Sequence, residues 1–153
     1  MPEDMSKTEV DALVEKINLQ YGARLSFEGR LLSKNEKRGA KKIFRFTGLK
    51  VPHVPAEWVG SHFCTVDADG AVIPSIEGAQ QIGLTAEKII LVSSAEAEDI
   101  MAGKDIEAKE GLTEGYYLLK SGADVLGVGK IEGGRILSFI PKSRRTSKQY
   151  SRE

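Results

Sequence analysis

"GYYLLKSGADVLGVGKIEGGRILSFIP", residues 115–141, decides the fold of the C-terminal part of this chain. Its apolar runs are separated by two turn signals, Ser121-Gly122 and Gly133-Gly134. Three short strands joined by tight turns make a β meander. The stretch therefore predicts a small β barrel.

The glycines of this stretch also invite comparison with phosphate-binding loops. A Walker loop needs a lysine after its last glycine, because backbone N–H groups and the ammonium must converge on the phosphates. Gly122 and Gly127 have the Walker spacing, but Val128 occupies the lysine position. Gly127 and Gly129 begin a dinucleotide fingerprint, but Glu132 replaces its third glycine and a strand follows instead of a helix. We expect the paired glycines to bend a barrel strand instead.

Three helices are expected upstream. The first begins at the capping box of Ser6 with Glu9 and ends at Gly22, with an apolar face between them. Residues 75–83 predict a short second helix, and a repeat of the capping-box spacing at residues 93–96 predicts a third.

Strand signals lie between these helices. Residues 23–28 alternate in polarity, residues 41–48 are rich in aromatic side chains, and residues 88–93 form an apolar run, so each predicts a strand. Residues 65–74 predict a hairpin with Asp-Gly at its tip. Residues 51–58 contain two prolines and predict an extended connection.

Together these patterns predict an α+β fold. We expect a small N-terminal α/β domain at residues 1–83, a β-barrel domain at 84–145 and a basic tail at 146–153. The 153 residues, 41% of them hydrophobic, can supply a core. The N-terminal segment is acidic where a secretory signal would be positive and then apolar, so we expect a cytoplasmic protein. A single cysteine, Cys64, cannot form an internal disulfide.

Charge is segregated along the chain although the net charge is zero. Residues 30–50 are basic except for Glu36, residues 51–114 are mostly acidic, and residues 115–153 are basic again. Such asymmetry indicates an anionic partner, provided that the two basic segments meet on one face. The alternative is that these lysines and arginines are ordinary solvated surface residues.

Catalytic and metal-binding patterns are weak. His53, His62, Cys64 and Asp67 could be assembled into a metal site, but their spacing matches no usual ligand pattern. His62 and Cys64 are two residues apart and should share one face of a strand, yet no third group orients them. The sequence therefore predicts no catalytic residue, no metal site and no cofactor. A metal-dependent enzyme using His53 and His62 is the least favoured alternative.

Residues 115–145 resemble the C-terminal PUA-like RNA-binding domain of Nol-Nop-Sun type RNA cytosine-5 methyltransferases. In that family a hydrophobic strand leads to an "LG-x-GK" turn, then to a "G-R-hydrophobic" strand and a closing "PK-x-x-R". The corresponding segments here are residues 126–130, 134–136 and 141–145. The order of the two predicted domains is also similar to that of the Nip-type ribosome-biogenesis proteins.

This resemblance implies RNA binding without chemistry. The methyltransferase apparatus is missing: no glycine-rich adenosylmethionine loop follows a first strand, and Phe63 precedes Cys64 where the catalytic motif has proline. Val128 stands between the two glycines, where the methyltransferases often have an aromatic residue. We therefore expect affinity to depend mainly on charge.

The hypothesis is a non-catalytic protein that binds structured tRNA or rRNA and acts in RNA modification or ribosome biogenesis. Its partners would be that RNA and, beside it, an RNA methyltransferase or a ribosome-assembly protein, with no membrane. The alternative is a protein-interaction adaptor anchored through Trp58. The residues expected to contact RNA are Lys37, Arg38, Lys41, Lys42, Lys120, Lys130, Arg135, Lys142, Arg144 and Arg145.

Overall fold

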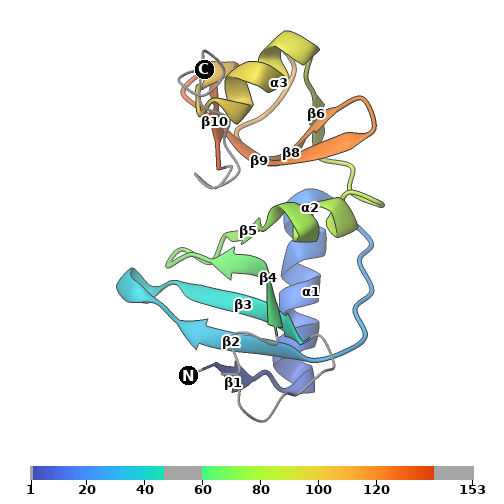
Figure 1. The fold of residues 1–153 in the computed structure, drawn as a ribbon, viewed down its shortest axis with the longest axis vertical. Coiled ribbons are helices and arrows are strands. Elements are labelled where there is room, and N and C mark those ends of the chain that lie inside the picture. The colour runs from blue at the N-terminus through green and yellow to red at the C-terminus, as the bar shows by residue number, and fades with distance from the viewer. Residues whose placement is uncertain (1, 47–59, 140–153) are drawn as a thin grey trace, which may run out of the picture.

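The structure is a computed structural model that describes residues 2–46 and 60–139 (Figure 1). Predictions that concern His53, Trp58, Lys142, Arg144 and Arg145 lie outside these residues. Within them the chain forms helices and two five-stranded sheets, in agreement with an α+β fold. The helices are α1 (Lys7–Tyr21), α2 (Ile76–Ile82) and α3 (Ser94–Met101).

The helices begin and end where the sequence predicts. In α1 the Ser6 hydroxyl accepts a hydrogen bond from the Glu9 N–H at 3.1 Å, and the Glu9 carboxylate accepts one from the Ser6 N–H at 2.9 Å. Gly22 ends this helix in the left-handed conformation, with φ 60°. Ser75 caps α2, and a second complete capping box at Ser93 opens α3. All three predicted helices are confirmed.

The first sheet is antiparallel throughout and has the strand order β1-β2-β3-β4-β5. Helix α1 packs on one of its faces through its buried residues. The strands are β1 (Glu3–Asp4), β2 (Leu31–Asn35), β3 (Lys41–Phe46), β4 (Gly60–Val66) and β5 (Val72–Pro74).

The strand expected at residues 23–28 is wrong. The side chain of Asn18 accepts a hydrogen bond from the Leu25 N–H at 2.8 Å and donates one to the Leu25 carbonyl at 3.1 Å. Because a side chain satisfies these backbone groups, the segment needs no ladder partner. The alternation of polarity has another origin: Ala23 and Leu25 are buried in the core, and Phe27 packs against it.

The second sheet contains the predicted β meander. Its strands are ordered β6-β8-β9-β10-β7, with β6 parallel to β8 and every other pair antiparallel. Figure 1 shows that this sheet curls, as a partly closed barrel does. The strands are β6 (Ile89–Leu91), β7 (Ile106–Glu107), β8 (Gly115–Ser121), β9 (Asp124–Glu132) and β10 (Arg135–Ser138).

The paired glycines bend strand β9, as expected. Leu119 pairs with Gly127 but Lys120 pairs with Val125, so one residue of β9 is left over and forms a bulge. Gly127 has φ 149°. A Cβ on Gly129 would lie 2.9 Å from methyl carbons of Leu119 and Ile136, which is too close for a side chain. Glycine is needed at these two places for backbone and packing reasons.

Two hydrophobic clusters lie on opposite faces of the second sheet. The larger cluster joins α1, α2 and the first sheet to Leu118 and Val128 of the second sheet. The smaller cluster lies on the other face, where Ile100 of α3 packs with Leu119 and Ile136. Helix α2 lies between the two sheets in Figure 1. The larger core therefore extends across residue 83, and the domain boundary placed there stays a prediction.

Candidate nucleic-acid interface

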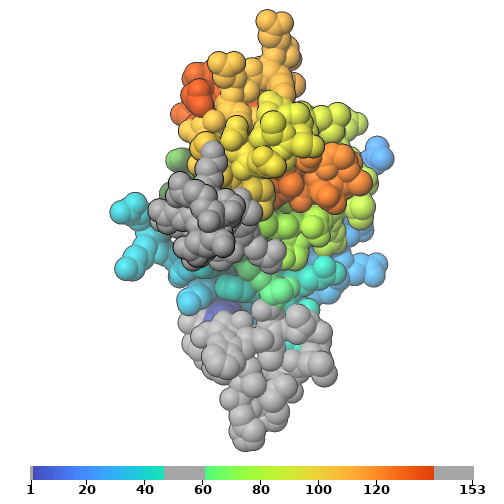
Figure 2. Space-filling view, turned by 45° about the horizontal axis from the view of Figure 1, so that its top comes forward, coloured from blue at the N-terminus to red at the C-terminus, as the bar shows by residue number. Residues whose placement is uncertain are grey.

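Seven of the ten predicted RNA contacts fall in the described residues. Lys37 and Arg38 form the turn between β2 and β3, where Arg38 has a left-handed backbone with φ 63°. Both side chains are exposed, and the tip of this hairpin projects from the left side of the space-filling view (Figure 2). The tip therefore presents two cations to solvent.

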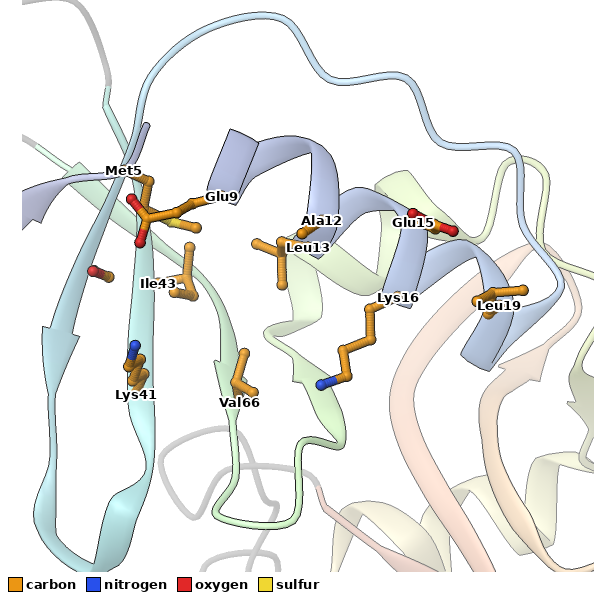
Figure 3. Close-up of a pocket in the computed structure, with 11 residues that line it drawn as sticks. Met5, Glu9, Ala12, Leu13, Glu15, Lys16, Leu19, Lys41, Ile43 and Val66 are labelled. Atoms are coloured by element: carbon orange, nitrogen blue, oxygen red, sulfur yellow. The ribbon is translucent and has the colours of Figure 1, made fainter. Parts of the chain in front are cut away.

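The other two members of this basic block lie on opposite faces of the first sheet. Lys41 lies on the α1 side, where it lines a groove of about 390 Å³ together with Glu9 and Ile43 (Figure 3). Lys42 lies on the other face, in register with Lys34 of β2. Because successive side chains along a strand point to opposite faces, Lys41 and Lys42 are separated although they are neighbours in the sequence.

The face of the first sheet away from α1 carries a mixed polar and aromatic set. Lys42 forms an ion pair with Glu36 at 3.6 Å. The His62 ring lies 6.0 Å from the Phe44 ring, and its Nε2 is 3.1 Å from the Thr65 hydroxyl oxygen. Burial, and then the nearby Lys42 charge, lowers the pKa of His62 below its usual 6.5. The ring is therefore neutral at physiological pH.

His62 and Cys64 do not share a face, contrary to the expectation from their spacing. Ile43 pairs with Cys64 but Phe44 pairs with His62, so Phe63 is an extra residue in β4. Cys64 is fully buried in the α1-facing core, and burial raises the pKa of its thiol to about 12. Among the described residues no group of three or more His, Cys, Asp or Glu side chains could hold a metal ion.

The second sheet joins a cation to two aromatic rings. Lys130 of β9 pairs with Tyr116 of β8, and its ammonium lies 5.3 Å from the centre of the Tyr116 ring. The rings of Tyr116 and Phe139 are stacked, with centroids 5.8 Å apart and planes inclined by 28°. Lys130 also contacts the Glu132 carboxylate at 3.7 Å. We call Tyr116, Phe139 and Lys130 the aromatic platform.

The remaining predicted residues of this sheet do not all join the platform. Lys120 lies four residues along β8 from Tyr116, roughly 13 Å at about 3.3 Å per residue. Arg135 begins β10 on the side of the platform, and its guanidinium donates to the Asp105 carbonyl at 2.9 Å. The structure thus brings Lys130 and Arg135 to one end of the sheet and leaves Lys120 at the other.

Three aromatic residues on these two surfaces were not among the residues predicted from the sequence: Phe44, Tyr116 and Phe139. Each of these aromatic residues lies opposite or beside a lysine in the sheet. This neighbourhood can be recognised only when the register between the paired strands is known. No helix in the described part of the chain is both long enough and apolar enough to cross a membrane.

Comparison with known families agrees with the resemblance seen in the sequence. Residues 87–146 match the family described as the Methyltransferase RsmF PUA domain. No curated protein matches the chain. The matched residues include all of β8, β9 and β10, and hence the platform side chains. Residues 87–146 are therefore similar to the PUA domain of the methyltransferase RsmF, which supports a PUA-like domain in the C-terminal part of this chain.

Proposed function

We propose that this protein binds structured RNA, tRNA or rRNA, and catalyses no reaction itself. The observation that supports this most is the match of residues 87–146 to the PUA domain of a methyltransferase family. We further propose that it acts in the cytoplasm in RNA modification or ribosome biogenesis. There it would accompany an RNA methyltransferase or a ribosome-assembly protein.

The distribution of exposed cations favours RNA. Lys37 and Arg38 extend from the tip of the β2–β3 hairpin, and Lys130 and Arg135 lie at one end of the second sheet. Long cationic side chains at such positions can reach a phosphate backbone, and neutralising phosphates releases counterions. Such contacts position an RNA without reading its sequence, which suits recognition of shape.

The properties of Cys64 support the proposal that the protein is not an enzyme. A thiol whose pKa is raised to about 12 is protonated at neutral pH and is a poor nucleophile. The buried Cys64 side chain is also inaccessible to a substrate.

Salt-dependent binding of the full chain to total tRNA and to an rRNA helix tests the proposal. We expect affinity to fall steeply with salt. The double variant Arg144→Ala/Arg145→Ala should reduce the slope of log K against log salt by about 0.7 to 0.9 for each phosphate that the protein no longer neutralises. The matched control is Lys7→Ala/Lys104→Ala. It removes the same charge from two exposed ion pairs elsewhere and should leave the slope unchanged.

Two outcomes would count against parts of this proposal. No binding of the wild-type chain even at low salt would contradict RNA binding. An equal reduction of the slope in the control variant would leave RNA binding standing but would contradict a specific contact at Arg144 and Arg145, because it would mean a diffuse charge effect. In the first case the adaptor alternative should be tested, by seeking a protein partner whose binding is abolished in Trp58→Ala.

A further inference from the structure

The aromatic platform is built differently from the core. Tyr116 is half-buried and packs against the larger hydrophobic cluster. Phe139 stacks on Tyr116, belongs to neither cluster and keeps 37% of its surface exposed. One ring is thus anchored in the protein, while the other extends the stack toward solvent.

The position of Phe139 is fixed by the backbone. Its N–H donates to the Val128 carbonyl at 2.9 Å, which continues the β9–β10 ladder beyond the last assigned residue of β10. A ring held by its own main chain and by a stacked neighbour loses little conformational entropy when a ligand covers it. This preorganised aromatic surface is therefore suited to binding a second flat group.

Lys130 supplies charge beside the rings. Its ammonium lies 5.3 Å from the Tyr116 centroid, on the same strand pair, and its side chain is 33% exposed. An exposed aromatic ring next to a cation is the combination that binds single-stranded nucleic acid, in which bases stack on the ring and phosphates contact the cation.

We propose that an unpaired RNA base stacks on Phe139 while Lys130 contacts a neighbouring phosphate. The inference rests on the proposed RNA binding and adds a substrate class to it: RNA with an unpaired nucleotide in a loop, a bulge or an end. In a continuous A-form duplex each base is covered above and below by its neighbours, so its flat face cannot reach an exposed ring. The platform thus selects nucleotides that are out of the stack.

The test compares two RNAs of equal length and charge: a hairpin whose loop carries a fluorescent adenine analogue, and a fully paired duplex. We expect Phe139→Ala to weaken hairpin binding by about 5- to 150-fold, the range for one base–aromatic stack, and to leave duplex binding unchanged. The fluorescence change on binding, which reports stacking of the analogue, should disappear. The salt slope should stay constant in this variant and fall by about one in Lys130→Gln.

Further variants separate stacking from folding. Phe139→Leu keeps an apolar side chain without a π face and should behave like Phe139→Ala, whereas Phe139→Trp should restore both affinity and the fluorescence change. Leu91→Ala removes another exposed apolar side chain, 67% exposed on β6, and should change neither. Thermal unfolding of each variant checks that the fold is retained.

The outcomes distinguish this inference from the proposed function. If the wild-type chain binds both RNAs and Phe139→Ala binds the hairpin equally well, the platform is not a base-stacking site and general RNA binding stands. The same conclusion follows if Phe139→Leu keeps the fluorescence change. If the wild-type chain binds neither RNA at low salt, the proposed function fails and this inference fails with it.

Discussion

The two sheets of this protein use their faces differently. The first sheet packs one face against α1, and its other face carries charged and polar side chains such as Lys34, Lys42 and His62. The second sheet contributes to a hydrophobic cluster on each face, through Leu118 on one side and Leu119 on the other. Its exposed functional groups are therefore confined to the ends of its strands.

A dense run of cations in the sequence does not by itself place those cations on one surface of the protein. Residues 30–50 contain the densest run of cations, yet Lys41 and Lys42 point to opposite faces of the first sheet. The second sheet has fewer cations but holds one of them, Lys130, over the Tyr116 ring, which stacks on Phe139. The two sheets thus differ in arrangement more than in composition: one spreads its cations over both faces, and the other places a cation beside an aromatic ring.

The largest effect should come from Leu118→Ala, which breaks the packing between the two sheets. Leu118 belongs to β8 but is fully buried in the cluster formed with α1 and the first sheet. Truncating such a residue typically costs about 2–5 kcal/mol. We expect urea unfolding, followed by circular dichroism, to remain one transition with a lower midpoint, because both sheets depend on this cluster.

Leu91→Ala is the control for that measurement. Leu91 lies on the edge strand β6 with 67% of its surface exposed, so its truncation should change the free energy of unfolding by less than about 0.5 kcal/mol. Two separate transitions in Leu118→Ala would mean that the sheets unfold independently and that the shared core contributes little.

Local signals in the sequence predicted much of this fold. Both capping boxes, the glycine at the end of α1 and the turns of the meander act over a few residues, so they can be read without knowing the fold. The segment at residues 23–28 failed because its alternation reflects burial, and an Asn18 side chain seven residues away satisfies its backbone. Alternation predicts which residues are buried but does not supply a partner strand.

The candidate site was less predictable because it depends on register. The bulge that separates His62 from Cys64, and the pairing that places Lys130 beside Tyr116, are properties of two strands together. The charge pattern indicated cationic side chains, and their roles stay a prediction. It could not indicate that Lys120 lies at the far end of β8 from the platform.

A second prediction compares the two faces of the first sheet in RNA binding. The double variant Lys34→Gln/Lys42→Gln removes two cations from the face away from α1, whereas Lys16→Gln/Lys41→Gln removes two that line the groove beside α1 (Figure 3). If the face away from α1 contacts phosphates, the first pair should lower the salt slope of RNA binding by up to about two. In that case the groove pair should lower it by less, because its two lysines lie on the opposite side of the sheet. If the two double variants lower the salt slope equally, RNA binding depends on the overall charge of the protein and not on one face of this sheet.

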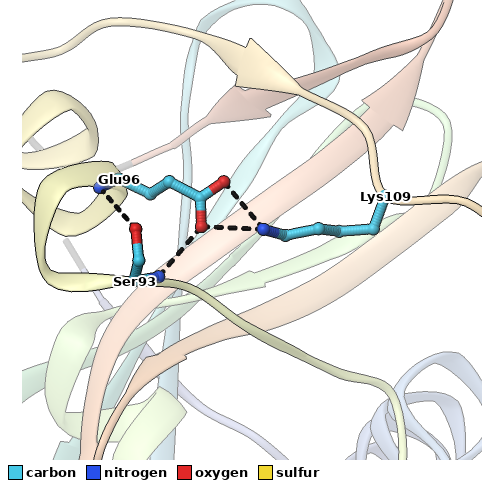
Figure 4. Close-up of polar contacts among 3 residues, drawn as sticks. All are labelled: Ser93, Glu96 and Lys109. Carbon is cyan, nitrogen blue, oxygen red and sulfur yellow. Dashed lines mark hydrogen bonds and ion pairs between the residues drawn. The ribbon is translucent and has the colours of Figure 1, made fainter.

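The smallest expected effect concerns the capping boxes of α1 and α3, which differ in one contact. Lys109 donates to both carboxylate oxygens of Glu96 at 2.7 Å (Figure 4), whereas no lysine in the described part of the chain donates such a bond to Glu9. The Lys109 hydrogen bond, followed by the Ser93 N–H, holds the pKa of Glu96 below its usual 4.5. For Glu9 the main cause of the lower pKa is the Ser6 N–H.

Lys109→Ala should make Glu96 titrate like Glu9. Because the folded-state pKa of Glu96 is depressed, its stabilising contribution is complete above pH 4.5 and is lost as pH falls through the folded value. We expect NMR titration of the variant to give a Glu96 pKa closer to 4.5 but still below it, since the Ser93 N–H still donates to the carboxylate. The loss of stability at neutral pH should be under about 1 kcal/mol, because the pair is partly exposed. An unchanged pKa would mean that Ser93, and not Lys109, sets the titration of this capping box.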